Sequence, residues 1–486
     1  MSSPQTSLSR SRYNLRPRKG RLASWQSLPT EIWSIIFSFA LPDDWESSAA
    51  LGRRRLKYAE VCRAWRSIAF ATTPLWTSIV IDFTTLRHDL AMADLVERTG
   101  QAPLHIKILG PGGSMRDAKS WSFWKQICAL SHRWASLRIW VDNLETACRE
   151  LGGEFPLLRS LSMWQGQGDT SFGNPLRFFG SAPNVSRLKI RWARASDRQT
   201  LPAVLLPSAW SLTHLDLNLC NCTFVDPQLS PLTVAVTAVT VCGDTLRSAS
   251  FAWETDDSSP LTPLTEPLVT LPSLENLELQ REASGMLLIM AAPNLQKLLL
   301  GGKPAPKVSL TPFTYYGGLQ PPEDLALSRL RTFLDRSDDC PRLRDLHLCR
   351  VQLDGALDCL RRLNSLVCLE IVSYVANDAG LSLVRGLVRD PTVPTSMALL
   401  PCLKVLTICH EEWVKQRIVR RPFCAAVRSR RIPVTLGSST LAIIETCHTH
   451  CSHTLLHGSF HMSDGDQGEY DMTVDRIDAG FDLRLP

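Results

Sequence analysis

The feature of this sequence that most constrains its fold is a short phrase of apolar residues that recurs along the chain beyond residue 80. The phrase is a Leu, two variable residues, a second Leu, one variable residue and a further apolar residue, often with a Pro in front. Clear copies centre on Leu161, Leu188, Leu215 and Leu277, and further copies end at Leu300, Leu348, Ile371 and Ile408. Leu161, Leu188 and Leu215 follow one another at intervals of 27 residues. Such regular spacing indicates a chain built from stacked structural repeats.

The phrase also predicts the structure of each repeat. Alternate residues of a strand point to one side, so the apolar positions of the phrase share a core. Each repeat can bury that side only against its neighbours, and stacking therefore produces a solenoid with a curved parallel sheet. One copy, from Leu212 to Cys220, resembles a leucine-rich repeat down to its final Cys, which most other copies lack. We expect an α/β fold: a short helical module, then an irregular leucine-rich-repeat-like solenoid over residues 81–445.

The variable residues of the phrase should point to the other side of the sheet, which is the usual binding surface of stacked arrays. They are Arg138, Trp140, Ser162, Trp164, Lys189, Arg191, Asp216, Asn218, Glu278, Gln280, His347, Glu370 and Thr407. Trp and Arg are common anchors of protein interfaces. The predicted contacts for a bound target protein are therefore Trp140, Trp164, Lys189 and Arg191. The alternative is that the two Trp side chains pack against adjoining loops.

The N-terminal residues 1–23 have a different character. They contain Ser and Pro, almost nothing apolar, and a run of basic residues: Arg10, Arg12, Arg16, Arg18, Lys19 and Arg21. This composition predicts a disordered basic tail, which either serves nuclear import or nucleic-acid contact or is simply solvated. The net charge of the whole chain is only +6 over 486 residues, which does not favour a nucleic-acid-binding protein.

Residues 24–80 have the apolar spacing of helices. Pro29 suits the first position of a helix, and the apolar residues Ile32, Ile35, Ile36 and Phe39 then recur at helical spacing. This helix should end before Pro42. A second helical pattern runs from Leu56 to Ala69, and the segment closes at Pro74.

The order of residues in this segment resembles the F-box family. The matching elements are Leu28-Pro29-Thr30-Glu31-Ile32, Ile36-Phe37, Val61-Cys62-Arg63-Ala64-Trp65-Arg66, Ala69 and Pro74-Leu75-Trp76. The segment departs from the family in its longer, Arg-rich connection at Gly52–Arg55. In that family a three-helix module binds a Skp-type adaptor, which docks onto a cullin that carries a RING subunit. By position, the resemblance implies adaptor contacts at Leu28, Pro29, Ile32, Ile36, Val61, Cys62 and Trp65.

The residues themselves favour a partner as well. A module of about 55 residues cannot bury all of its apolar surface, so exposed Leu, Ile and Trp would favour association. The alternative is that these side chains form the core of a helical hairpin that packs on the following domain.

The cysteines and apolar windows bear on where the chain resides. Its 15 cysteines are scattered, and no apolar segment behind the starting Met resembles a signal peptide. We therefore expect reduced thiols and a cytoplasmic or nuclear location. The most apolar windows are far shorter than the roughly 20 residues that span a bilayer, so no membrane association is expected.

A search for catalytic and metal-binding motifs gives one weak candidate. The chain contains no phosphate-binding Gly loop, nucleophile elbow, His-Glu-x-x-His helix or Cys-x-x-Cys pair. Residues Cys447–His453 are rich in Cys and His, but zinc sites usually need two separated ligand pairs. We expect no metal, and we assign residues 446–486 to a C-terminal tail that is acidic beyond this cluster.

The resemblance to the F-box family, together with the repeats, implies a substrate-recognition subunit of a Skp–cullin–F-box ubiquitin ligase. The F-box would bind the adaptor, the repeat array would bind a target protein, and the chain itself would be no enzyme and need no cofactor. The alternative is a leucine-rich-repeat scaffold without a ligase role. A nucleic-acid-binding protein and a hydrolase are weaker alternatives, since neither has a supporting motif.

Overall fold

The computed structural model describes residues 28–40, 57–82, 92–109, 124–141, 151, 153–165, 175–192, 200–201, 204–219, 223–224, 230–253, 269–301, 325–373, 378–410, 413–436 and 439–451. The predicted basic tail, the Arg-rich connection and the predicted acidic segment after residue 451 lie outside these residues. The chain divides into two compact units, which are described separately. Unit 1 comprises Met1–Ser78 and Ala93–Ala102, and unit 2 comprises Ile79–Met92 and Pro103–Pro486.

Unit 1 is helical. Its elements are α1 (Thr30–Phe39), a helical stretch at residues 57–61, α3 (Arg63–Ala71), the 3₁₀ turn η2 (Thr73–Leu75) and α4 (Met92–Thr99). The core consists of Phe37, Ala69, Leu75 and Trp76, with Trp33, Tyr58, Trp65, Ile68 and Phe70 packed against it. The guanidinium of Arg98 in α4 lies over the Phe70 and Trp76 rings, 4.3 and 4.9 Å from their centroids. The unit therefore takes in a helix beyond the predicted boundary at residue 80.

Unit 2 is built on a 13-stranded sheet. In spatial order its strands are β1 (Ser78–Asp82), β2 (Leu104–Leu109), β3 (Trp134–Val141), β4 (Ser160–Gln165), β5 (Arg187–Trp192), β7 (His214–Asn218), β9 (Ser248–Trp253), β11 (Asn276–Arg281), β13 (Lys297–Gly301), β14 (Asp345–Cys349), β15 (Cys368–Ser373), β16 (Val405–His410) and β19 (Thr446–Cys451). Every pair from β2 to β19 is parallel. The predicted α/β class with a parallel sheet is confirmed.

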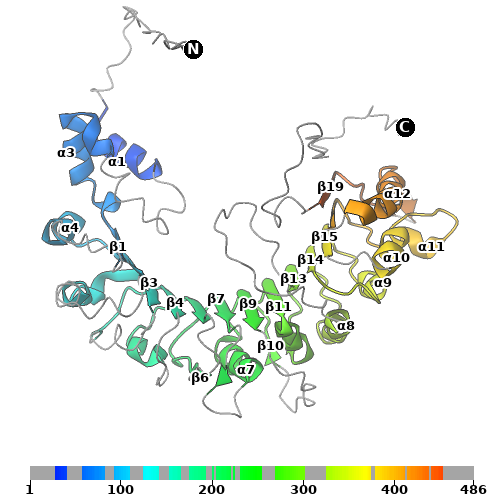
Figure 1. The fold of residues 1–486 in the computed structure, drawn as a ribbon, viewed down its shortest axis with the longest axis horizontal. Helices are drawn as coiled ribbons and strands as arrows, with labels where there is room; N and C mark the ends of the chain where they lie inside the picture. Colours follow the sequence, from blue (N-terminus) through cyan, green and yellow to red (C-terminus); the bar gives the residue numbers. More distant parts are fainter. Residues whose placement is uncertain are drawn as a thin grey trace, which may run out of the picture. The chain divides into compact units, whose positions relative to one another are not determined.

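Helices and short turns return the chain from one strand to the next. They are η4 (Ser131–Arg133), η5 (Pro175–Phe179), α7 (Pro231–Cys242), η6 (Glu282–Leu288), α8 (Ala326–Arg336), α9 (Ala356–Leu360), α10 (Asp378–Gly386), α11 (Pro394–Met397) and α12 (Trp413–Ser429). Figure 1 shows α7, α8, α9, α10 and α12 on the outer side of the curved sheet. Three two-stranded sheets flank these connections: β6 (Thr200–Leu201) with β8 (Thr223–Phe224), β10 (Val269–Thr270) with β12 (Met290–Ala291), and β17 (Thr435–Leu436) with β18 (Ser439–Thr440).

The middle leucines of the phrase form one buried ladder across the sheet. In register, it joins Ile106, Leu137, Leu161, Leu188, Leu215, Ala249, Leu277, Leu298, Leu346, Leu369, Leu406 and Cys447. All of these side chains are buried. At β9 the small Ala249 is followed two residues later by the buried Phe251, so volume lost at one position is restored at the next inward position.

The last strand corrects a predicted boundary. β19 pairs in parallel with β16, so that Cys447 lies opposite Leu406 and Thr449 opposite Ile408. The sheet therefore continues to Cys451, six residues past the predicted end of the array at 445. The buried Cys447 occupies a core position that Leu fills in most other strands.

A fully buried arginine joins the elements at the C-terminal end of unit 2. Arg430 donates hydrogen bonds to the carbonyls of Leu387 at 2.8 Å, Leu399 at 2.9 Å and Leu400 at 3.1 Å. Burial, with a smaller effect from Arg389, lowers the pKa of Arg430 to about 9. The guanidinium is still charged near neutral pH, and three carbonyl dipoles stabilise that charge.

No helix in the part of the chain that the structure describes is long and apolar enough to cross a bilayer.

Candidate functional site

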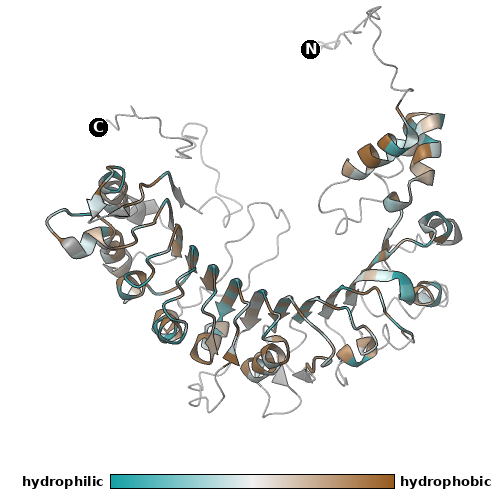
Figure 2. Cartoon of the chain, turned by 180° about the vertical axis from the view of Figure 1, so that it is seen from behind, coloured by the Kyte–Doolittle hydropathy of each residue, from teal (hydrophilic) through white to brown (hydrophobic). Residues whose placement is uncertain are grey.

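The first candidate surface is a stripe of exposed apolar side chains on unit 1, which we call the α1 stripe. It consists of Leu28, Ile32, Ile35, Ile36 and Phe39. Phe39 is 85% exposed and Ile35 is 50% exposed. The spacing of Ile32, Ile35, Ile36 and Phe39 brings them to one side of α1 at 3.6 residues per turn, and Leu28 precedes the helix by two residues. Figure 2 shows brown, apolar residues along α1 between paler, more polar ones.

The other side of α1 is already occupied by the core of unit 1. The Trp33 ring lies 5.0 Å from Trp65, and the Phe37 ring lies 5.0 Å from Tyr58 and 5.1 Å from Trp65. Because α1 buries this aromatic side within unit 1, its second apolar side is left to water. Exposing several large aliphatic and aromatic side chains costs about 1.5–3 kcal/mol each relative to full burial, which favours a partner.

The structure separates the seven predicted adaptor contacts into two groups. Leu28, Pro29, Ile32, Ile36 and Val61 are exposed. Cys62 and Trp65 are half-buried and hold unit 1 together, since the Cys62 Sγ accepts a hydrogen bond from the Trp65 backbone N–H at 3.4 Å and caps α3. Sequence reasoning did not assign Ile35 and Phe39 as contacts, although their helical spacing with Ile32 and Ile36 pointed to them.

Trp65→Ala is expected to destabilise unit 1 by about 2–4 kcal/mol, because it removes a ring that packs on both Trp33 and Phe37. Limited proteolysis of the full chain would show faster cleavage within residues 28–82. Val61→Ala is the matched control, because Val61 is exposed beside the same helix and its loss should change the stability little. Equal cleavage rates in the two variants would contradict the packing role of Trp65.

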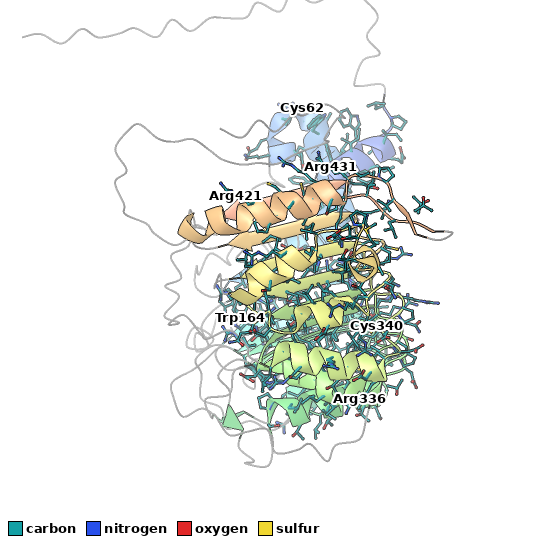
Figure 3. All side chains as sticks on the ribbon, turned by 90° about the vertical axis from the view of Figure 1, so that its right-hand side faces the viewer. Cys62, Trp164, Arg336, Cys340, Arg421 and Arg431 are labelled. Atoms are coloured by element: carbon teal, nitrogen blue, oxygen red, sulfur yellow. The ribbon has the colours of Figure 1, made fainter. Side chains whose placement is uncertain are left out.

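The second candidate surface lies on the side of the sheet away from the leucine ladder. Trp140 on β3, Trp164 on β4 and Arg191 on β5 occupy one register position on three consecutive strands. The two indole rings are stacked, with centroids 4.5 Å apart and an angle of 9° between their planes. The Arg191 guanidinium carbon lies 5.8 Å from the Trp164 ring centroid. Figure 3 shows Trp164 and Cys340 at opposite edges of the array, which places Trp164 near the ends of the strands.

A second row of polar residues runs beside this stack. Lys107, Arg138, Ser162 and Lys189 are in register from β2 to β5, and the row continues to Asp216 on β7. Lys189 forms an ion pair with Asp216. Burial, and secondarily the neighbouring Arg138, lowers the pKa of Lys107. We call Lys107, Arg138, Trp140, Trp164 and Arg191 the basic–aromatic patch.

Acidic side chains follow further along the same row. Asp216 and Glu278 lie on β7 and β11, and Glu370 on β15 interacts with His347 on β14. The sheet surface is therefore basic and aromatic over β2–β5, and its acidic side chains begin at Asp216 on β7. The four predicted target contacts lie together, on adjacent strands, but Lys189 is the one whose charge an internal carboxylate compensates.

The Cys/His-rich segment begins in β19, the last strand of the sheet. Cys447 is buried and lies in the core, and burial raises the pKa of its thiol. The backbone of His448 is in register with that of Thr407. Among the residues that the structure describes, no three Cys, His, Asp or Glu side chains are placed to hold a metal ion. Burial also raises the pKa of other thiols, to about 12 for Cys340 and about 11 for Cys242 and Cys359.

Comparison with protein-family models matches residues 25–82 to the F-box-like family. This segment comprises the described helices α1 and α3 and the turn η2, and it ends with β1. The chain therefore contains an F-box-like domain, which is a protein-interaction module, as the resemblance in the sequence indicated. The strands from β2 to β19 lie outside the match. No curated protein matches the chain.

Proposed function

We propose that the chain is a substrate receptor of a Skp–cullin–F-box ubiquitin ligase. The single observation that carries the proposal is the α1 stripe, which is exposed on an F-box-like domain whose own core is complete without it. The stripe would bury itself against a Skp-type adaptor, and the adaptor would connect the chain to a cullin and its RING subunit. The repeat array would hold a target protein on its sheet surface.

In this proposal the chain supplies proximity and no bond-making chemistry. Holding a target near a ubiquitin-charged enzyme raises the effective concentration of the target's lysines. The high pKa values of the buried thiols are consistent with packing groups that stay protonated. A cytoplasmic or nuclear location, where thiols are kept reduced, suits both the free cysteines and the proposed partners.

The test is co-purification of the full chain with a Skp-type adaptor. Ile36→Glu combined with Phe39→Glu introduces two charges at the centre and end of the α1 stripe and is expected to weaken adaptor binding at least a hundredfold. Ile432→Glu is the matched control, since Ile432 is an equally apolar, 65% exposed residue of unit 2. Circular dichroism should be the same for all three proteins.

Two outcomes would overturn the proposal. Either the unaltered chain captures no adaptor, or the stripe variant captures as much as the Ile432→Glu control. The chain would then be an interaction scaffold without a ligase role, which the parallel array alone would still support.

A further inference from the structure

We propose that the basic–aromatic patch binds a short, extended, acidic segment of a protein, with an apolar or Pro residue of that segment covering Trp140. This inference rests on the proposed function only in calling the bound protein a target, since the binding itself needs no adaptor. The acidic segment would cross β2–β5, and its carboxylates would meet Arg138 and Arg191.

The aromatic part of the patch is ordered before any ligand arrives. Trp140 is 43% exposed, yet its ring is held by stacking on Trp164. Arg191 in turn lies over Trp164. An anchor that is already in place loses little side-chain entropy on binding, and Trp is among the residues that contribute most to interfaces. The exposed part of the Trp140 side chain provides an apolar surface for a Pro ring or an aliphatic side chain.

The charges of the patch select an anionic ligand. Lys107 and Arg138 are opposite each other in register, and their like charges destabilise one another. A carboxylate placed between them and Arg191 would relieve that repulsion and form charge-assisted hydrogen bonds. Lys189 contributes less, because Asp216 already neutralises it.

The size of the basic region favours a peptide over a nucleic acid. Three strand spacings separate β2 from β5, which is roughly 14 Å and matches about four residues of extended peptide. Beyond β5, the row turns acidic at Asp216 and Glu278, which would repel a continuing chain of phosphates. A short acidic stretch fits these limits, whereas a long polyanion meets like charge on the next strands.

The experiment is a fluorescence-anisotropy titration of the full chain without adaptor. The probe is a labelled eight-residue peptide of alternating Glu and Pro, compared with the same peptide in which Gln replaces Glu. We expect the Glu peptide to bind at least tenfold more tightly and to lose affinity as salt is raised. Arg138→Gln combined with Arg191→Gln should weaken it at least tenfold.

Two further variants identify the surface. Lys297→Gln is the matched control, because Lys297 is an exposed cation on the same side of the sheet at β13, and it should leave the affinity unchanged. Trp140→Ala should weaken both peptides, since both carry Pro. If the double Arg variant does not fold by circular dichroism, Arg138→Gln alone serves, because Arg138 is exposed.

The proposal fails if the Glu and Gln peptides bind equally or if the double Arg variant matches the Lys297→Gln control. It also fails, in favour of a nucleic-acid surface, if labelled oligothymidylate of the same length binds more tightly than the Glu peptide. None of these results bears on adaptor capture by the α1 stripe, so the two proposals stand or fall separately.

Discussion

An Arg430→Met variant is expected to unfold about 2–4 kcal/mol more easily than the unaltered chain, because the change leaves three buried carbonyl groups without their donor. The carbonyl of Leu387 follows α10, and those of Leu399 and Leu400 precede β16, so one side chain joins segments that are far apart in sequence. Loss of a charge that was costly to bury offsets part of the effect.

The measurement is the urea midpoint of the full chain, with hydrogen exchange to locate the change within residues 378–436. Arg428→Met is the matched control, because Arg428 lies at the end of α12, two residues before Arg430, but is exposed. The control should stay within about 0.5 kcal/mol of the unaltered chain. If both variants had the same urea midpoint, the three hydrogen bonds of Arg430 would contribute nothing measurable to stability.

Gly301→Ala is expected to break the pairing of β13 with β14 and to destabilise this part of the sheet by about 3 kcal/mol or more. Gly301 has a φ of 90°, and a Cβ there would lie 1.6 Å from the carbonyl oxygen of Cys349. The obstacle is backbone that is in register with Gly301, so no side-chain rotation can relieve it. Neither the conformation nor the space admits any other residue.

The Gly355→Ala variant separates the strain of a positive φ from the clash of the added Cβ with the backbone. Gly355 also has a positive φ, of 77°, but nothing lies within 4 Å of the position that a Cβ would take there. The Gly355→Ala variant should therefore lose only the stability that the unfavourable backbone conformation of Ala costs, about 1 kcal/mol. Hydrogen exchange of β13 and β14 in the Gly301→Ala chain should rise to the rate of exposed amides. Protection equal to that of the Gly355→Ala chain would show that the sheet accommodates the added methyl group.

The leucine phrase predicted most strands of the sheet, because apolar residues at alternate positions of a strand all point to the same, buried side. It failed where other residues take the apolar positions. At β2, Pro103 stands three residues before Ile106, where the phrase has its first Leu. At β19, Cys447 and Thr449 take the positions of the second and third apolar residues. A pattern written in leucines cannot detect a core position filled by a thiol.

The interaction surfaces were only partly predictable. Both sides of α1 are apolar, so periodicity could not tell which side faces the core and which faces water. Only the aromatic contacts show that Trp65 belongs to the core. On the sheet, the phrase predicted that Trp140, Trp164 and Arg191 share one side, and the strand register brings them to one position on three consecutive strands. The pairing of Lys189 with Asp216 depends on side-chain positions, which the spacing of the phrase does not contain.

The in-register sheet has a consequence for how the protein tolerates damage. In the described sheet, each interior strand pairs with one strand on either side, so the free energy of unfolding is approximately a sum of local contributions. A substitution at Gly301 would disrupt the sheet between β13 and β14. The strands before this break, including β2–β5, would stay folded. Heat or denaturant should therefore unfold the strands of the sheet in stages, and mutations in distant strands should have nearly additive effects on stability.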